Sequence, residues 1–297
     1  RESVAGALAD RYLAEKKPVI DFISPSRNGQ IPPPRNPEAN AATEAPAPPV
    51  SAALAAHYAA SDFTFGHDLR HGARVGQRVM AWANLADGSN ADHLLAYAEG
   101  RPDLAPILVE TDAGGLIGTH RVLRFSFSET LVARGGGQIS TKLSPDALTC
   151  FLVVRPDAEL APVLRLQSPE LDPAAGISLS GRGFSGIVRE DKAWKAAGLS
   201  APKQRFAIVS LVWDAKKGVH RAFARMPDGK AVAAKPVKTS VKGHAFNGYK
   251  LGHIPSGRGD TNLFKGDIAE MILYGAALSD RDRKEVEDHL FQRYFAK

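Results

Sequence analysis

Two acidic residues near the C-terminus are the first candidates for chemistry. Asp267 and Glu270 lie in the apolar segment 264–274, which has the composition of a strand. Enzymes that cleave glycosidic bonds commonly use two carboxylates, about 5 Å apart when the reaction retains configuration. Residues three apart on a strand point to opposite faces unless a bulge intervenes. The spacing therefore argues against a catalytic pair, and we expect both carboxylates to form structural hydrogen bonds at the sheet edge and to the closing helix.

Trp194 is the aromatic residue that best fits a ligand site. It stands in a polar stretch with Arg189, Lys192 and Lys195, and no strand pattern is visible there as far as Arg205. Sugar rings stack on exposed aromatic rings, and basic neighbours attract uronate or sulfate groups. We therefore predict that these four residues bind a ligand at the rim of the domain. The alternative is that Trp194 is buried and pins this stretch to the domain.

Two aspartates are candidates for a structural calcium site. Asp62 and Asp112 fall in predicted loops, where carboxylate and backbone oxygens could hold Ca²⁺. The alternative is that both are solvated loop carboxylates. No other cofactor is expected, because the Gly-x-Gly-x-x-Gly string at 181–186 is followed by a strand-like run, whereas a dinucleotide site needs a helix there.

Composition limits the classes of partner. The chain has 297 residues, a formal net charge of +6 and a single cysteine, Cys150, in an apolar run. One cysteine excludes an internal disulfide, so Cys150 is predicted to be a small buried residue. The modest positive charge is compatible with an acidic glycan or simply with solubility, and we expect no nucleic-acid partner. No apolar run reaches the roughly 18 residues of a membrane span.

The first 50 residues differ from the rest. Residues 24–50 contain eight of the 20 prolines and are predicted to form an extended linker. Residues 1–23 are predicted to be a helical segment, whose apolar stripe Val4, Leu8 and Tyr12 matches a stripe in the last helix. We interpret this segment as the tail of a preceding related domain, and the alternative is an unrelated helix that docks on the body of the chain.

Residues 51–297 have the pattern of an all-β domain. Short apolar runs alternate with turn residues, which is typical of a sandwich or barrel. Ser279 is expected to cap one closing helix, with Asp282 in the position of a capping-box acid. The predicted strands are 54–58, 79–83, 122–127, 147–154, 163–167, 206–213, 219–226, 249–253 and 267–274.

Several of these stretches resemble a known family. Residues 264–274, followed by 277–280 and the last helix, resemble the last strand and closing helix of bacterial laminin-G-like domains of the concanavalin A-like lectin/glucanase group. The family commonly has Trp and Asp in its second strand, where this chain has Trp82 and Asn84. Further stretches resemble other strands of these domains in the same order, namely 54–62, 79–84, 122–125, 150–156, 212–214 and 228–230.

The resemblance implies a two-sheet antiparallel jelly-roll sandwich with one C-terminal helix and a Pro-rich N-terminal linker. It also implies a non-catalytic module that binds carbohydrate or a protein partner within a larger, extracytoplasmic bacterial protein. One alternative is a structural or assembly domain of a multi-subunit complex. A second is a sandwich-type polysaccharide-degrading enzyme, which would need a convergent cluster of catalytic side chains that the sequence does not show.

Overall fold

The computed structural model describes the chain from residue 46 to residue 297, with gaps. The predicted helical segment 1–23 and most of the linker 24–50 lie outside the described residues, as do Asp62 and Lys192. The described residues are 46–61, 64–65, 73–82, 84–86, 94–95, 105–126, 130–134, 143–144, 146–157, 161–167, 175–180, 183–190, 193–200, 204–239, 246, 248–252 and 264–297.

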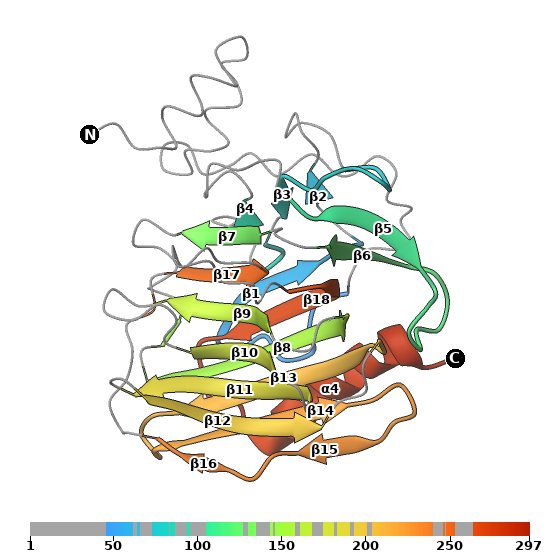
Figure 1. Ribbon diagram of the computed structural model, residues 1–297. Coiled ribbons are helices and arrows are strands. Elements are labelled where there is room, and N and C mark those ends of the chain that lie inside the picture. The colour runs from blue at the N-terminus through green and yellow to red at the C-terminus, as the bar shows by residue number, and fades with distance from the viewer. Residues whose placement is uncertain are drawn as a thin grey trace, which may run out of the picture.

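Two nine-stranded sheets lie face to face and form the body of the structure (Figure 1). The first, which we call sheet A, contains in order β15 (Ala231–Ala233), β14 (Val219–Arg225), β13 (Ala207–Asp214), β8 (Ala147–Pro156), β18 (Gly266–Tyr274), β6 (His120–Phe125) and β5 (Ile107–Thr111), with β1 (Leu54–Ala59) beside β18 and β16 (Val237–Lys238) beside β14. The second, sheet B, contains in order β12 (Ala193–Ser200), β11 (Gly183–Glu190), β10 (Ala175–Ser180), β9 (Ala161–Gln167), β17 (Gly248–Gly252), β7 (Thr130–Arg134), β4 (Leu94–Leu95), β3 (Ala81–Trp82) and β2 (Thr64–Phe65).

The fold is the predicted all-β jelly-roll sandwich. Paired strands in both sheets run antiparallel, as in β13 with β8 and in β11 with β12. Each of the predicted strands overlaps a strand of the structure. Cys150 is fully buried, as predicted, and burial raises the pKa of its thiol to about 12. None of the helices in the described part of the chain combines the length and apolar character needed to cross a membrane.

Sheet A is covered on both of its faces. One core lies between the two sheets and includes Leu152 and Met271, and a second lies on the opposite face of sheet A and includes Phe151 and Ile272. Helix α4 (Asp280–Phe295) lies over this opposite face (Figure 1). Strands that are buried on both faces are near-continuous apolar runs rather than alternating ones. This explains the near-continuous apolar runs in β8, β13 and β18.

Helix α4 begins where the sequence predicts. The Ser279 hydroxyl accepts a hydrogen bond from the Asp282 backbone N–H at 3.1 Å and donates to the Asp282 carboxylate at 2.8 Å. An N-cap of this kind typically contributes about 1 kcal/mol. The helix then buries Val286, Leu290 and Tyr294, the stripe expected from spacing.

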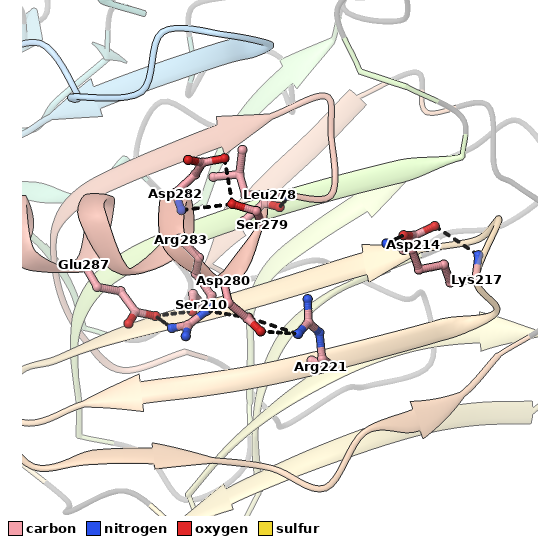
Figure 2. Close-up of polar contacts among 11 residues, drawn as sticks. Ser210, Asp214, Lys217, Arg221, Leu278, Ser279, Asp280, Asp282, Arg283 and Glu287 are labelled. Carbon is pink, nitrogen blue, oxygen red and sulfur yellow. Dashed lines mark hydrogen bonds and ion pairs between the residues drawn. The ribbon is translucent and has the colours of Figure 1, made fainter.

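Polar contacts tie α4 to the strands below it (Figure 2). The Glu287 carboxylate accepts a hydrogen bond from the Ser210 hydroxyl of β13 at 2.8 Å and pairs with Arg283 one turn away. Arg221 of β14 pairs with Asp280 at 3.0 Å. The Glu287 contacts are buried and position the helix, whereas an exposed pair such as Arg221–Asp280 adds little stability.

The stretch around Trp194 differs from its prediction. Residues 189–205 are predicted to lack strands, but β11 extends to Glu190 and β12 spans Ala193–Ser200. The sequence of β12 is rich in Ala and Gly, which are depleted in strands. Pairing along the whole length of β11 outweighs this weak local preference, so the stretch forms a hairpin.

The described part of the glycine string at 181–186 begins strand β11, so a strand and not a helix follows it, as the sequence predicts. Gly183 pairs with Ser180 across the β10–β11 hairpin. Gly186 faces sheet A, where an added Cβ would lie 2.7 Å from a Leu211 methyl group and 3.1 Å from the Ala222 Cβ. Gly186 is therefore needed because the two sheets approach closely at this point.

Gly186→Ala should lower the free energy of unfolding by about 1–2 kcal/mol, because the added methyl group overpacks the interface between the sheets. Urea denaturation measures the change. The matched control is Gly198→Ala on the neighbouring strand, where the added Cβ would meet only the Ser185 hydroxyl at 3.8 Å. That control should change stability by less than about 1 kcal/mol. Equal losses in the two variants would contradict the close approach of the sheets at Gly186.

Candidate functional site

Trp194 lies on the outer face of sheet B, which is the face that points away from sheet A. Along β12, Ala197 and Leu199 are buried in the core between the sheets, while Trp194, Ala196 and Gly198 are exposed. This alternation is the two-residue period of a strand. Trp194 is 45% exposed, so the alternative interpretation, in which it is buried and pins the stretch, does not describe the structure.

Arg189 is the direct cross-strand neighbour of Trp194. The two residues are opposite each other in the β11–β12 pair, and the guanidinium carbon lies 5.6 Å from the centre of the indole ring. This is within the range of a cation–π interaction. The contact orients the indole and keeps a positive charge beside it, as the sequence predicts for these two residues.

The other two predicted ligands are not placed beside Trp194. Lys195 follows Trp194 directly in β12, so its side chain points to the opposite face of the strand, together with Ala197. The structure therefore does not bring Lys195 to the face that carries Trp194, because strand residues that are adjacent in sequence lie on opposite faces. Lys192 lies outside the described residues.

Two basic residues that sequence reasoning missed share this face. Arg165 of β9 lies between the core residues Leu164 and Leu166, and Lys250 of β17 is opposite Arg165 in the β9–β17 pair. Both side chains therefore lie on the outer side of sheet B, where Arg165 is half-buried and Lys250 is only 5% exposed. The signal was available in the predicted strands, where a basic residue between two core apolar residues marks the outer face.

Small residues separate Arg165 from the hairpin. In the same row across sheet B, Arg165 pairs with Gly176 of β10, and Gly176 pairs with Ile187 of β11. Gly176 itself is buried, and Arg165 and Ile187 are half-buried. The exposed Trp194 ring and the half-buried Arg189 and Arg165 side chains are therefore the groups on this side of sheet B that could meet a negatively charged ligand.

Asp267, the first catalytic candidate, is buried in an ion-pair cluster. Its carboxylate lies 2.8 Å from the Arg124 Nε of β6 and 2.6 Å from an Arg155 guanidinium nitrogen of β8. The Asp267 side chain has no exposed surface. Strand β18 lies inside sheet A, so the expected position of this carboxylate at the sheet edge is wrong.

Glu270, the second candidate, is buried beneath α4. One carboxylate oxygen lies 2.9 Å from His57 Nε2 of β1, and the other accepts a hydrogen bond from the Tyr294 hydroxyl at 2.7 Å. The Arg293 guanidinium lies 3.4 Å away. Burial opposes ionisation, but the hydrogen bond and charge of His57, the charge of Arg293 and the Tyr294 hydroxyl outweigh it, so the pKa of Glu270 lies below its ordinary value. The expected hydrogen bond from this strand to the closing helix is confirmed.

A bulge decides the relation between the two carboxylates. The pairing of β18 with β8 shifts between Ile268 and Glu270, so residues three apart both contact groups on the α4 side of the sheet. The sequence predicted opposite faces unless a bulge intervenes, and the bulge in β18 places the two carboxylates on the same side of the sheet. Because Asp267 and Glu270 are buried and neutralised by neighbouring side chains, they stabilise the fold and offer no carboxylate pair to a substrate.

The calcium prediction stays untested. Asp112 is exposed just after β5, and Asp62 lies outside the described residues. Within the described part of the chain, no group of three or more His, Cys, Asp or Glu side chains is arranged to hold a metal ion.

Comparison with known proteins shows the fold and no family. No protein-family model and no curated protein matches the chain. Among solved structures, it is similar to Trypanosoma rangeli sialidase in complex with sialic acid, with 13% identity and a TM-score of 0.50 over 94% of this chain and 38% of that chain. A complex of that sialidase with 2,3-difluorosialic acid gives 14% identity and a TM-score of 0.50 over 83% of this chain and 34% of that chain. The CBM40 of Ruminococcus gnavus IT-sialidase, bound to α2,3 sialyllactose, gives 15% identity and a TM-score of 0.43 over 56% of this chain and 95% of that chain.

These likenesses concern the β-sandwich. The chain spans 38% of the length of the first sialidase, and the two sialidase matches, at 13% and 14% identity, show a shared architecture only. What the chain binds must therefore be argued from its own residues.

Glu270→Gln should lower the free energy of unfolding by roughly 3 kcal/mol at pH 7, because it removes one charge of a buried network. A carboxyl whose pKa is depressed in the folded state adds stability above its unfolded pKa of about 4.3, and that stability is lost as pH falls through the folded value. The gap between wild type and Glu270→Gln should therefore shrink below about pH 4 in urea titrations. Glu110→Gln, which breaks the half-exposed 3.2 Å pair with Arg121, should cost less than about 1 kcal/mol at every pH. A pH-independent gap for Glu270→Gln would show that its charge is not stabilising.

Proposed function

We propose that this chain is a non-catalytic carbohydrate-binding module of the laminin-G-like kind within a larger protein. The observation that carries the proposal is the exposed Trp194 ring, held beside the Arg189 guanidinium on the outer face of sheet B. Aromatic rings in this setting stack on the C–H faces of sugars, and a strand pair holds the ring more firmly than a loop would. A glycan ligand also favours an extracytoplasmic setting.

The charges on this face indicate which glycans to test. Arg189 and Arg165 lie half-buried on the outer side of sheet B, so a carboxylate- or sulfate-bearing sugar would be attracted to the surface beside Trp194. The alternative is a polysaccharide-degrading enzyme. Asp267 and Glu270 do not support it, because both carboxylates belong to sheet A and are fully buried in ion pairs.

Trp194→Ala should weaken binding of oligogalacturonate at least about tenfold, because it removes the stacking platform. Isothermal titration calorimetry measures the binding. Because Trp194 is 45% exposed, the melting temperature should fall by no more than a few degrees. The matched control is Ile117→Ala, which truncates another exposed apolar side chain, 41% exposed in the β5–β6 connection, and should leave binding unchanged. A large loss of stability in Trp194→Ala with unchanged binding would show that the residue only packs.

Arg165→Gln should weaken binding of oligogalacturonate severalfold and make it less sensitive to salt, because one cation–carboxylate attraction is lost. Binding of the carboxyl-reduced counterpart, a galactan, should not change. Arg281→Gln is the control, since Arg281 is a highly exposed residue of α4 beyond the other face of sheet A. Equal effects of Arg165→Gln on the charged and the reduced oligosaccharide would contradict a role in carboxylate recognition.

A further inference from the structure

Among the described strands, β12 ends sheet B and has one unpaired edge. It pairs with β11 along its whole length, from Gly183 opposite Ser200 to Glu190 opposite Ala193. On its other side, no described residue pairs with it. An edge strand presents a row of backbone donors and acceptors that can pair with another chain.

The hairpin geometry identifies which residues face this edge. Glu190 and Ala193 flank a two-residue loop and are paired, so they form a hydrogen-bonded pair, and every second pair along the strands does the same. The residues between them direct their backbone N–H and C=O groups away from β11. These are Trp194, Ala196, Gly198 and Ser200, whose side chains are also the exposed ones.

The edge lacks the features that usually prevent strand addition. Eight residues pair with β11 in unbroken register, so there is no bulge, and the segment contains no proline. Its only charged residue, Lys195, points to the opposite face from Trp194. Natural edge strands are normally shortened, bulged, charged or covered. An edge that has none of these features is expected to be covered by a partner.

We propose that β12 pairs antiparallel with β12 of a second copy of this chain, around a two-fold axis beside Ala196. In this register, Ala196 is opposite Ala196 of the second copy, and Trp194 is opposite Gly198 of the second copy. Three residue pairs then face each other with their free backbone groups and exchange about six hydrogen bonds. The two B sheets become one continuous sheet across the dimer.

The side chains of β12 are complementary to themselves in this register. A Cβ added to Gly198 would meet only the Ser185 hydroxyl, at 3.8 Å, so the surface above Gly198 is open. The indole of the second copy's Trp194 can lie there, and an aromatic residue across from glycine is a favourable cross-strand pair. Because no charged side chain of β12 lies on this face, the two copies do not repel each other across the seam.

The dimer would bring two Trp194 rings onto one surface. They would be four residues, or about 13 Å, apart along the strands. The inference depends on the strand edge and not on glycan binding, so the two proposals can fail separately. A monomeric wild type that binds oligogalacturonate overturns only the dimer, and a stable dimer that binds no glycan overturns only the proposed function.

Sedimentation equilibrium of the whole chain should give twice the chain mass at micromolar concentrations. Ala196→Lys should raise the dimer dissociation constant at least tenfold, because it places two ammonium groups opposite each other at the two-fold axis. Its melting temperature at low concentration should match that of monomeric wild type, since Ala196 is exposed. Ala231→Lys, at an exposed position on edge strand β15 of sheet A, is the matched control and should leave the dimer intact. A wild type that stays monomeric up to roughly 100 μM, or an Ala196→Lys variant that still dimerises normally, overturns the proposal.

Cysteine cross-linking tests the register. In a hydrogen-bonded antiparallel pair the two Cα atoms are about 5.5 Å apart, which suits a disulfide. Ala196→Cys should therefore form a covalent dimer under mild oxidation, whereas Ser200→Cys should not, because the two Ser200 residues lie far apart along the seam. The native Cys150 is buried and does not compete. Equal cross-linking at both positions overturns the register.

Discussion

The central strands of sheet A are buried on both faces, and the rest of the structure follows from this constraint. Sheet B covers one face of β8, β13 and β18, and α4 covers the other. Any ionisable group on these strands must then find its partner inside the protein, because an unpaired buried charge costs several kcal/mol. Asp267 and Glu270 meet this requirement with arginines, a histidine and a tyrosine. The same contacts connect β1, β6, β8, β18 and α4.

Because sheet A is covered on both sides, a ligand has access mainly to the outer face of sheet B and to the ends of the sandwich. The outer face carries Trp194 and Arg189 on adjacent strands, and Arg165 two strands beyond Arg189. Glu270 is buried under α4 and Asp267 is buried between two arginines of sheet A, whereas the exposed Trp194 ring lies on sheet B. The two buried carboxylates and the exposed aromatic ring are therefore on different sheets.

The comparison of sequence with structure shows where local patterns are informative. Apolar runs such as 147–154 and 267–274 predicted β8 and β18. A strand that is buried on both faces requires a short, nearly continuous apolar run, and that run is visible in the sequence. Ser279 and Asp282 predicted the start of α4, because capping depends on residues within one turn. The strand within 189–205 was not predicted, because Ala and Gly have little strand preference of their own. These residues form β12 because β11 lies alongside and pairs with them. The face of Lys195 could not be assigned until this stretch was known to be a strand.

By itself, the sequence determined the all-β class, the closing helix and most of the core strands. It also indicated that a basic residue, Arg189, lies near Trp194. These features depend on periodicity and on contacts between residues near each other in the chain. Only the tertiary structure decided that Asp267 and Glu270 face the same side of sheet A, that Arg165 and Lys250 share a face with Trp194, and that β12 ends its sheet. Each of these depends on pairing between distant strands, where one bulged residue reverses the direction of the side chains that follow it.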